Sequence, residues 1–323
     1  MDLPHFLTKC RRDQWSVNDL DWKQSPRAMS AADEEAIVQY FTDMATIERL
    51  AGALFREQER RVADPVLKAI FRTFIVDEAR HAAVAERLAR FYDVRRLRAY
   101  RTSASLERFA PHFVDAIRYL SDDVANAYVT AGELMLDIAL LRSVNDYVND
   151  DMSAAAMKLV NRDESRHIAI DYHMVEYYAS AEYLERLAKA SRDQSMGNRA
   201  RAWWAFAHVL YYAKPFFRDV FFLPMSRVDP TGTRLREAIR RFQLLGEKPG
   251  VGDRPFGRFL LTMQDVFNHP VAGKVLGPLA ARLAGMEPEF MAQLNSEGER
   301  ARAKTMSYAA MAEEALAAKG ADA

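Results

Sequence analysis

One pattern occurs twice in this chain, as Asp77-Glu78-Ala79-Arg80-His81 and as Asp163-Glu164-Ser165-Arg166-His167. Both copies lie in strongly helical sequence. Because residues three apart share one face of a helix, Glu78 and His81 can bind one ion, and Glu164 and His167 can do the same. A single Glu-x-x-His spacing is common in charged helices and usually marks a solvated surface pair. Two copies in the same context predict a metal site with half of its ligands on each helix.

Two more glutamates are predicted to lie level with this repeat, and the first precedes Glu78. Asp64-Pro65 has the form of a helix cap followed by a first-turn proline, so a turn is expected there. Glu48 lies sixteen residues before Asp64, and Glu78 lies fourteen residues after it. At about 1.5 Å per residue, both carboxylates are roughly 20–25 Å from the turn, at one level of an antiparallel hairpin.

The second half of the chain repeats this spacing. Its turn is predicted at Asn149-Asp150-Asp151, with Glu133 before it and Glu164 at a similar distance after it. Four carboxylates and two imidazoles are therefore expected to converge at one level. Oxygen ligands with one imidazole per metal suit iron or manganese better than a zinc site, which usually recruits more nitrogen or sulfur.

This ligand pattern resembles that of the ferritin-like diiron-carboxylate superfamily, in which one Glu from each of two helices joins Glu-x-x-His from two others. The resemblance covers residues 31 to about 178. It implies an all-α fold with an N-terminal arm over 1–30 and a ferritin-like diiron four-helix bundle over 31–178. Residues 179–323 are expected to form a C-terminal all-helical extension of accessory helices packed on the bundle.

Within the superfamily, the chain is similar to soluble diiron oxygenases of the p-aminobenzoate N-oxygenase-like and acyl-carrier-protein desaturase-like kinds. That similarity implies a monooxygenase or oxidase for a small or carrier-bound organic substrate, with O2 as cosubstrate and a peroxo-diiron intermediate. The residues implied to hold two iron ions, or a mixed Mn/Fe pair, are also the implied catalytic residues: Glu48, Glu78, His81, Glu133, Glu164 and His167.

Two positions depart from particular members of the superfamily. Ala85 stands where the ribonucleotide reductase small subunit carries its radical tyrosine, and Val160 stands where the N-oxygenases add a third histidine. Radical storage and arylamine N-oxygenation are therefore disfavoured. Two alternatives stay open: an acyl desaturase or fatty-aldehyde oxygenase and, from another class, a non-catalytic metal-binding or ferroxidase protein.

The residues beside the expected ligands predict how the histidines are held. Asp77 and Asp163 each precede a ligand glutamate, and pseudo-twofold packing would direct each toward the histidine of the opposite helix. A carboxylate that accepts the second imidazole N–H fixes the tautomer of the ring and raises its basicity as a ligand. Arg80 and Arg166 are expected to neutralise these aspartates. The alternative for both pairs is an ordinary ion pair on a helix surface.

Small residues near the single glutamates predict a substrate cavity beside the metals. Ala51 and Gly52 follow Glu48, and Thr130 precedes Glu133. An oxygen-activating site needs room for a substrate, whereas a structural metal site tends to be closed. Close helix packing is an equally good reason for small residues. Tyr128 is a further candidate for this cavity, with a core tyrosine as the alternative.

The composition of the chain limits which binding partners and which cellular compartment are expected. The formal net charge is zero, which removes any global electrostatic reason to expect nucleic acid or an anionic membrane. The single cysteine, Cys10, excludes an intrachain disulfide and a cysteine-based cluster. Because a Rossmann glycine pattern is also missing, an external reductase or ferredoxin is the expected electron donor. The start of the chain has no secretion signal pattern, so a cytoplasmic location is predicted. A homodimer is compatible with the superfamily.

The most apolar stretch, 203–224, contains Lys214, Pro215, Arg218 and Asp219, so it is not expected to span a membrane. It is interpreted as a buried, proline-bent helix of mainly core aromatics, with a substrate-tunnel wall or a docking face for a partner or lipid as the alternatives. The glycines and prolines of 246–255 predict a loop there. The predicted helices cover 33–60, 65–92, 111–148, 152–178, 181–245, 256–268, 270–285 and 287–318.

Overall fold

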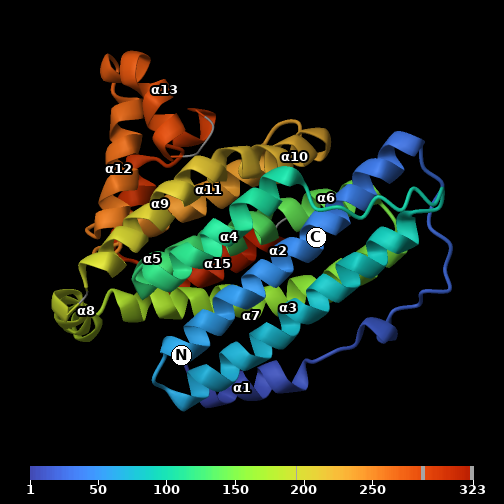
Figure 1. Ribbon diagram of the computed structural model, residues 1–323, viewed down its shortest axis with the longest axis horizontal. Helices are drawn as coiled ribbons and strands as arrows, with labels where there is room; N and C mark the ends of the chain where they lie inside the picture. The colour runs from blue at the N-terminus through green and yellow to red at the C-terminus, as the bar shows by residue number, and fades with distance from the viewer. Residues whose placement is uncertain (194, 285–287, 321–323) are drawn as a thin grey trace.

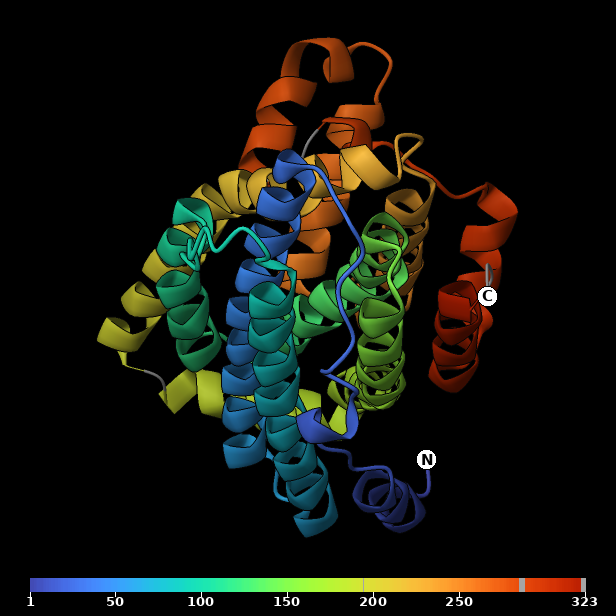
Figure 2. The same cartoon turned by 90° about the vertical axis from the view of Figure 1, so that its right-hand side faces the viewer.

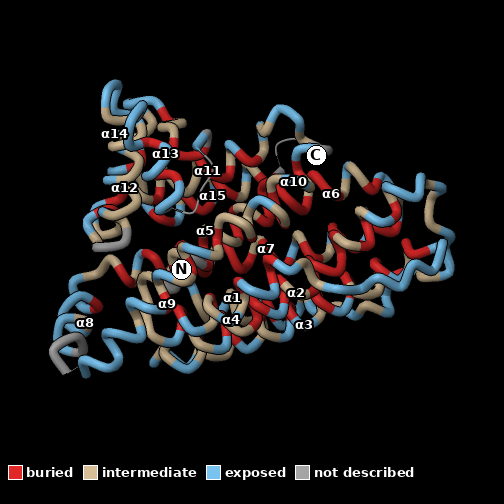
Figure 3. The backbone as a smooth tube through the Cα atoms, turned by 45° about the horizontal axis from the view of Figure 1, so that its top comes forward, coloured by how far each residue is buried: buried red, intermediate tan, exposed pale blue. Residues whose placement is uncertain are grey.

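The computed structural model describes residues 1–193, 195–284 and 288–320; within these ranges the side chains of 125, 128, 190–193, 227, 228, 255, 256, 284, 289 and 320 are not described. Every regular element of the described residues is a helix, which confirms the predicted all-α class. Two long helical hairpins lie side by side and carry most of the buried residues (Figure 1). The buried positions face the interior shared by these hairpins, while α8 and the outer ends of the C-terminal helices are largely exposed (Figure 3).

The first hairpin consists of α2 (Ala31–Arg61) and α3 (Pro65–Tyr92). Helix α2 begins two residues before the predicted start because the side chain of Ser30 accepts a hydrogen bond from the Asp33 N–H. Helix α3 has the predicted bounds. Asp64 accepts from the N–H groups of Val66 and Leu67, and Pro65 occupies the first helical turn, where no N–H partner is needed.

The second hairpin pairs a composite helix with α7 (Asp151–Tyr178). The composite helix runs through α5 (Asp122–Leu134), the π-helical turn η2 (Met135–Leu140) and α6 (Leu141–Val148). Asn149 ends it in the left-handed region with φ 44°, and Asp150 caps α7 by accepting from Met152 N–H at 3.0 Å. Nothing in the helix pattern of the sequence indicated the π turn.

Three predicted helices are divided in the structure. The 111–148 prediction was wrong because α4 (Ala104–Tyr119) contains Pro111, and the chain breaks at 120–121 before α5. The 181–245 prediction is interrupted at 229–232, where the Asp229 carboxylate accepts from backbone N–H groups and Gly232 has a positive φ of 65°. The 287–318 prediction is divided into η4 (Pro288–Met291), α14 (Glu297–Thr305) and α15 (Tyr308–Gly320).

The C-terminal helices pack on the hairpins. They begin with α8 (Ala181–Asp193), α9 (Met196–Phe216), the π turn η3 (Phe217–Phe222), α10 (Leu223–Val228) and α11 (Thr233–Gly246). Helix α9 lies along α4, and Phe109 stacks on Phe216 with ring centroids 4.3 Å apart. Helices α12 (Pro255–Asn268) and α13 (Ala272–Ala284) project from one end (Figures 1 and 2). The main buried core is continuous from the hairpins into α9, α11 and α15, whereas α12 and α13 contribute to a separate small cluster that contains Ala281 and Met291.

The N-terminal arm also contacts the first hairpin. It begins with α1 (Leu3–Arg12), which lies against α3, and continues through the short 3-10 helix η1 (Val17–Asp19). Between these elements, Gln14 and Trp15 reach the buried face of α3. The arm therefore brings residues distant in sequence to the interior of the two hairpins.

The aromatic stretch 203–224 is only partly buried, contrary to the interpretation from the sequence. Phe216 and Phe221 are buried, but Trp203, Trp204 and Tyr211 are 71 %, 69 % and 72 % exposed. The helix has two faces, and only one contacts the core. A different helix, Asp122–Val148, is long and apolar enough by composition to cross a membrane, but 69 % of that apolar window is buried inside the protein.

Candidate metal centre

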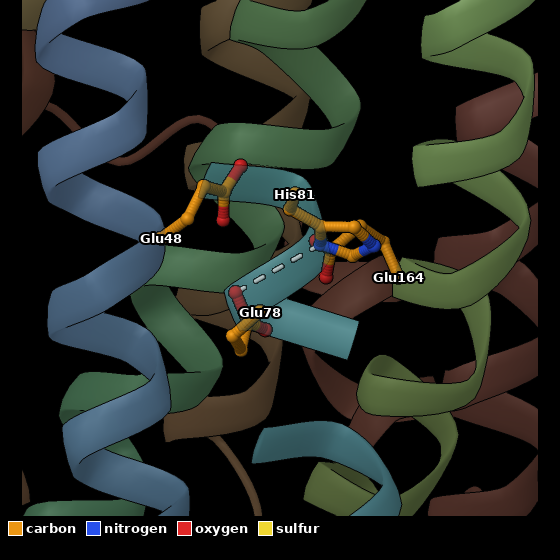
Figure 4. Close-up of side chains that lie close together, drawn as sticks. All are labelled: Glu48, Glu78, His81 and Glu164. Atoms are coloured by element: carbon orange, nitrogen blue, oxygen red, sulfur yellow. Dashed lines mark ion pairs between the residues drawn. The ribbon is translucent and has the colours of Figure 1, made fainter. Parts of the chain in front are cut away.

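The structure brings the six expected ligands together between the two hairpins. Their ligand atoms form two overlapping groups, within each of which the atoms lie no more than 4.8 Å apart. The first group contains Glu48, Glu78, His81 and Glu164, and Figure 4 shows these side chains converging from α2, α3 and α7. The second contains Glu78, Glu133, Glu164 and His167. Glu78 and Glu164 belong to both groups, so two ions held here would share them.

The imidazoles present the same ring nitrogen to these glutamates. His81 Nδ1 lies 2.9 Å from Glu164 Oε1. His167 Nδ1 lies 2.8 Å from Glu164 Oε2 and 3.1 Å from Glu78 Oε1. All six side chains are at most 4 % exposed. The six side chains are therefore shielded from bulk solvent, and each Nδ1 is close to the shared carboxylates.

Several buried oxygens in the centre make no hydrogen bond to any described residue. They are Glu48 Oε1 and both carboxylate oxygens of Glu78, although His167 Nδ1 lies 3.1 Å from Glu78 Oε1. A buried polar group without a partner costs about 1–3 kcal/mol, and more when it is charged. A metal cation would satisfy these oxygens, so the residues present fit a metal pair.

The electrostatics of the carboxylates also favour a bound cation. Burial, together with the charges of Glu78 and Glu164, raises the pKa of Glu48 well above its usual value. Burial and the same two neighbours raise the pKa of Glu133 similarly. Burial alone would raise the pKa of Glu164 too, but His167 and His81 hold it well below the usual value. Two divalent cations would supply four positive charges to these four glutamates and remove the repulsion among them.

Asp163 links the centre to the N-terminal arm. Its Oδ2 accepts from Trp15 Nε1–H at 2.6 Å and lies 3.2 Å from His81 Nε2, while its Oδ1 accepts from Arg166 at 2.7 Å. Burial opposes ionisation, but His81 and Arg166 lower the pKa of Asp163 to about 2. An ionised Asp163 favours the His81 tautomer that carries its proton on Nε2 and leaves Nδ1 free for a metal.

Asp77 occupies the corresponding place beside His167, with a longer contact. Its Oδ2 lies 3.6 Å from His167 Nε2 and accepts from Arg166 at 3.2 Å, and its Oδ1 accepts from Gln14 at 3.1 Å. Arg80 also pairs with Asp77 and donates to the Trp15 carbonyl oxygen at 2.7 Å. The side chains of Arg166 and Arg80 are only 2 % and 9 % exposed, so these are not the surface ion pairs of the alternative interpretation.

Sequence reasoning missed two buried aspartates. Asp137 lies four residues after Glu133, and Asp171 lies four residues after His167, so helical spacing was the available signal. Lys319 donates to Asp137 at 3.1 Å, and burial, opposed by that ammonium, raises the pKa of Asp137 to about 7. Neither Asp171 oxygen makes a hydrogen bond within the part of the chain that the structure describes, and burial raises the pKa of Asp171 well above its usual value. Gln14 was also missed.

Only some of the residues predicted to line a substrate cavity do so in the structure. An apolar cavity of about 170 Å³ reaches the centre at Glu133, and Ala51 lies in its wall. Gly52 does not line it: a Cβ added to Gly52 would lie 3.2 Å from Glu78 Cβ, so this glycine permits close packing of α2 and α3. Thr130 does not line it either, because its hydroxyl donates to the Asn126 carbonyl at 2.9 Å. Tyr128 lies outside the described side chains.

The chain was compared with protein-family models, curated proteins and solved structures, and none of them matches it. The functional assignment therefore depends on the geometry and chemistry of the centre itself.

Proposed function

We propose that this protein is a ferritin-like, non-haem diiron oxidoreductase that uses O2 as a monooxygenase or oxidase on a small organic substrate. The observation that supports this most is the pair of overlapping ligand groups that share Glu78 and Glu164. Shared carboxylates suit two adjacent cations. Buried oxygen donors with one imidazole for each ion match the preferences of iron and manganese.

In this proposal, Glu48 and His81 would complete one iron position, and Glu133 and His167 would complete the other. When bound, iron supplies the oxygen-reducing chemistry, and the protein supplies binding, orientation and the exclusion of water. Asp163 orients His81 through its Nε2 contact. Arg166 donates to both Asp77 and Asp163, and with His81 it lowers the pKa of Asp163 against the effect of burial. Asp171 lies one helical turn after His167, and burial raises the pKa of Asp171 well above its usual value.

The apolar cavity favours an organic substrate over a ferroxidase or scaffold role. Among the described residues that line it, Glu133 alone is ionisable. An iron ion entering as cargo needs oxygen ligands along its way, because a bare charge in an apolar passage is costly. A hydrocarbon group pays no such penalty. The external reductase or ferredoxin and the cytoplasmic location expected from the sequence belong to the same proposal.

The proposal is tested by loading the metal-free protein with ferrous iron without oxygen, counting bound iron, and following absorbance on mixing with O2. We expect about two irons per chain and a transient visible band. Glu78→Ala should lose iron while remaining folded by circular dichroism. Glu86→Ala is the matched control, because Glu86 lies on the same helix but pairs with Arg49 at the surface. Less than one iron per chain in the wild type, or full retention in Glu78→Ala, would overturn the proposal.

A further inference from the structure

The cavity beside Glu133 lies between the site-bearing helices and the C-terminal region. Helices α2, α4 and α5 form one part of its wall, and α9 with the π turn η3 forms another. Phe216, Phe217, Phe221 and Phe222 contribute aromatic side chains from that second part. The partly buried face of 203–224 therefore separates the metal centre from solvent and shapes the space next to it.

The chemistry of the wall is uniform. Its described residues are aliphatic, aromatic or glycine, with Glu133 as the exception. A charged or strongly polar ligand would lose its hydration here without gaining hydrogen bonds, which costs several kcal/mol. An uncharged hydrocarbon group gains from the same burial, at about 25 cal/mol for each Å² of apolar surface.

The volume limits the size of the occupant. An engineered apolar cavity of about 150 Å³ binds benzene, and this one measures about 170 Å³. A second cavity of about 110 Å³ adjoins it, and four residues line both: Ala127, Ile239, Phe242 and Leu260. These four residues lie where the two cavities meet, and the volume of the first cavity alone matches roughly one ring.

We propose that this cavity binds an uncharged hydrocarbon group of about one aromatic ring and presents it to the side of the centre formed by Glu133 and His167. The oxidation of that group rests on the proposed function, whereas its binding does not require iron. A monocyclic arene or an arene-bearing molecule is therefore the substrate class, in preference to a long acyl chain.

Gly132 offers a way to fill the cavity with little other disturbance. It lines the cavity, and a Cβ added to it meets no atom of the described side chains within 4 Å. Gly132→Leu therefore places a side chain in open space, and leaving glycine in a helix interior should itself stabilise α5 by about 0.5–1 kcal/mol. Ala213→Leu fills the cavity from α9 on the opposite wall. Gly298→Leu is the matched control, because Gly298 is exposed on α14 and also has open space around it.

The test measures toluene, benzoate and decanol binding to the metal-free protein by calorimetry and by thermal shift. We expect saturable 1:1 toluene binding that is roughly 100-fold tighter than that of benzoate. Gly132→Leu and Ala213→Leu should each weaken toluene binding by about tenfold or more, while Gly298→Leu leaves it unchanged. Circular dichroism checks that each variant is folded. Because the two cavity-filling substitutions lie on different helices, the test can still be made if one of these variants does not fold.

Three results would overturn the inference. They are the absence of saturable toluene binding, filling variants that bind like the wild type, and decanol binding more than about tenfold tighter than toluene. Because all binding is measured without iron, these results leave the iron-loading test untouched. Conversely, a protein that binds toluene but no iron would retain this cavity assignment and lose the proposed oxidoreductase function.

Discussion

The two copies of Asp-Glu-x-Arg-His have the same residues but different surroundings. On α3, His81 stacks near Trp15 with ring centroids 6.4 Å apart, and its Nε2 is 3.2 Å from Asp163. On α7, His167 packs against Phe55 and Phe74, with centroids 5.0 Å and 4.2 Å away, and its Nε2 is 3.6 Å from Asp77. The repeat thus places equivalent ligands in inequivalent environments.

The difference arises outside the repeat. The N-terminal arm supplies Trp15 to the side of His81, whereas the cavity opens beside Glu133 on the side of His167. One half of the candidate centre is covered by the N-terminal arm, and the other half faces the cavity. The repeat therefore brings equivalent side chains together, while contacts outside the repeat determine which half is covered and which half faces the cavity.

The largest expected effect distinguishes shared from unshared glutamates. Glu164→Ala removes a ligand from both groups and should reduce iron from about two per chain to nearly none. Glu48→Ala and Glu133→Ala should each leave about one iron, because each belongs to one group. Metal counting after anaerobic loading checks this. Equal losses in all three variants would contradict the two-position interpretation.

Arginine substitutions should show the asymmetry in stability. Arg166→Met removes the guanidinium that donates to both Asp77 and Asp163. Asp77 then keeps Arg80, but among the described residues Asp163 keeps no guanidinium closer than 3.6 Å, so the variant should cost about 3 kcal/mol in the free energy of unfolding. Arg80→Met should cost less, because Asp77 keeps contacts with Arg166 and Gln14. Urea unfolding of the metal-free variants compares the two values. A larger loss of unfolding free energy for Arg80→Met than for Arg166→Met would contradict this prediction.

The pH dependence tests a property that both halves share. Burial alone would lower the pKa of His81 and His167, but the neighbouring carboxylates raise it. Burial also raises the pKa of Glu48 and Glu133. A raised pKa stabilises the fold below the unfolded value, and that stability is lost as pH rises through the folded value.

Without metal, unfolding free energy should therefore decrease as pH rises from about 5 to 8, by about 1.4 kcal/mol per unit for each excess proton bound to the folded state. The lowered pKa of Asp163, about 2, gives the opposite loss only in strong acid. Iron should reverse the slope, because its ligands must be deprotonated. Thermal melts with and without iron measure both slopes, and Glu48→Gln should flatten the metal-free one. A metal-free slope that rises with pH would be inconsistent with these shifts.

The smallest effect concerns the arm. Trp15→Phe removes the indole donor to Asp163 and should weaken iron binding by about tenfold, mainly at the His81 position. Trp22→Phe is the matched control, because its indole donates to the Val17 carbonyl at 2.7 Å, away from the centre. Iron titrations of both variants compare the effect. If iron binding weakened equally in Trp15→Phe and Trp22→Phe, the effect would come from disturbing the arm as a whole and not from the loss of the hydrogen bond to Asp163.

Helical spacing and turn chemistry predicted much of this arrangement. The bounds of α3 followed from Asp64 and Pro65, and the proximity of six side chains followed from counting residues to each turn. Their role as ligands stays a prediction. The Trp15 contact could not be derived, because it joins residues 148 positions apart through the packing of an irregular arm. Gly52 shows the limit of composition, since a small residue can mark either a void or a close approach.

The π turn that follows Glu133 determines how this segment should respond to the deletion of a residue. A π turn holds one residue more than the α-helical turn it replaces. Deleting a single codon within Met135–Leu140 would therefore leave one α-helical turn in its place, so that α5 and α6 keep their present directions. A deletion elsewhere in α5 or α6 would instead rotate the parts on either side of it by about 100° relative to each other. The segment Met135–Leu140 should therefore tolerate single deletions that the flanking helices do not, a pattern that a deletion scan would reveal as a short run of surviving variants.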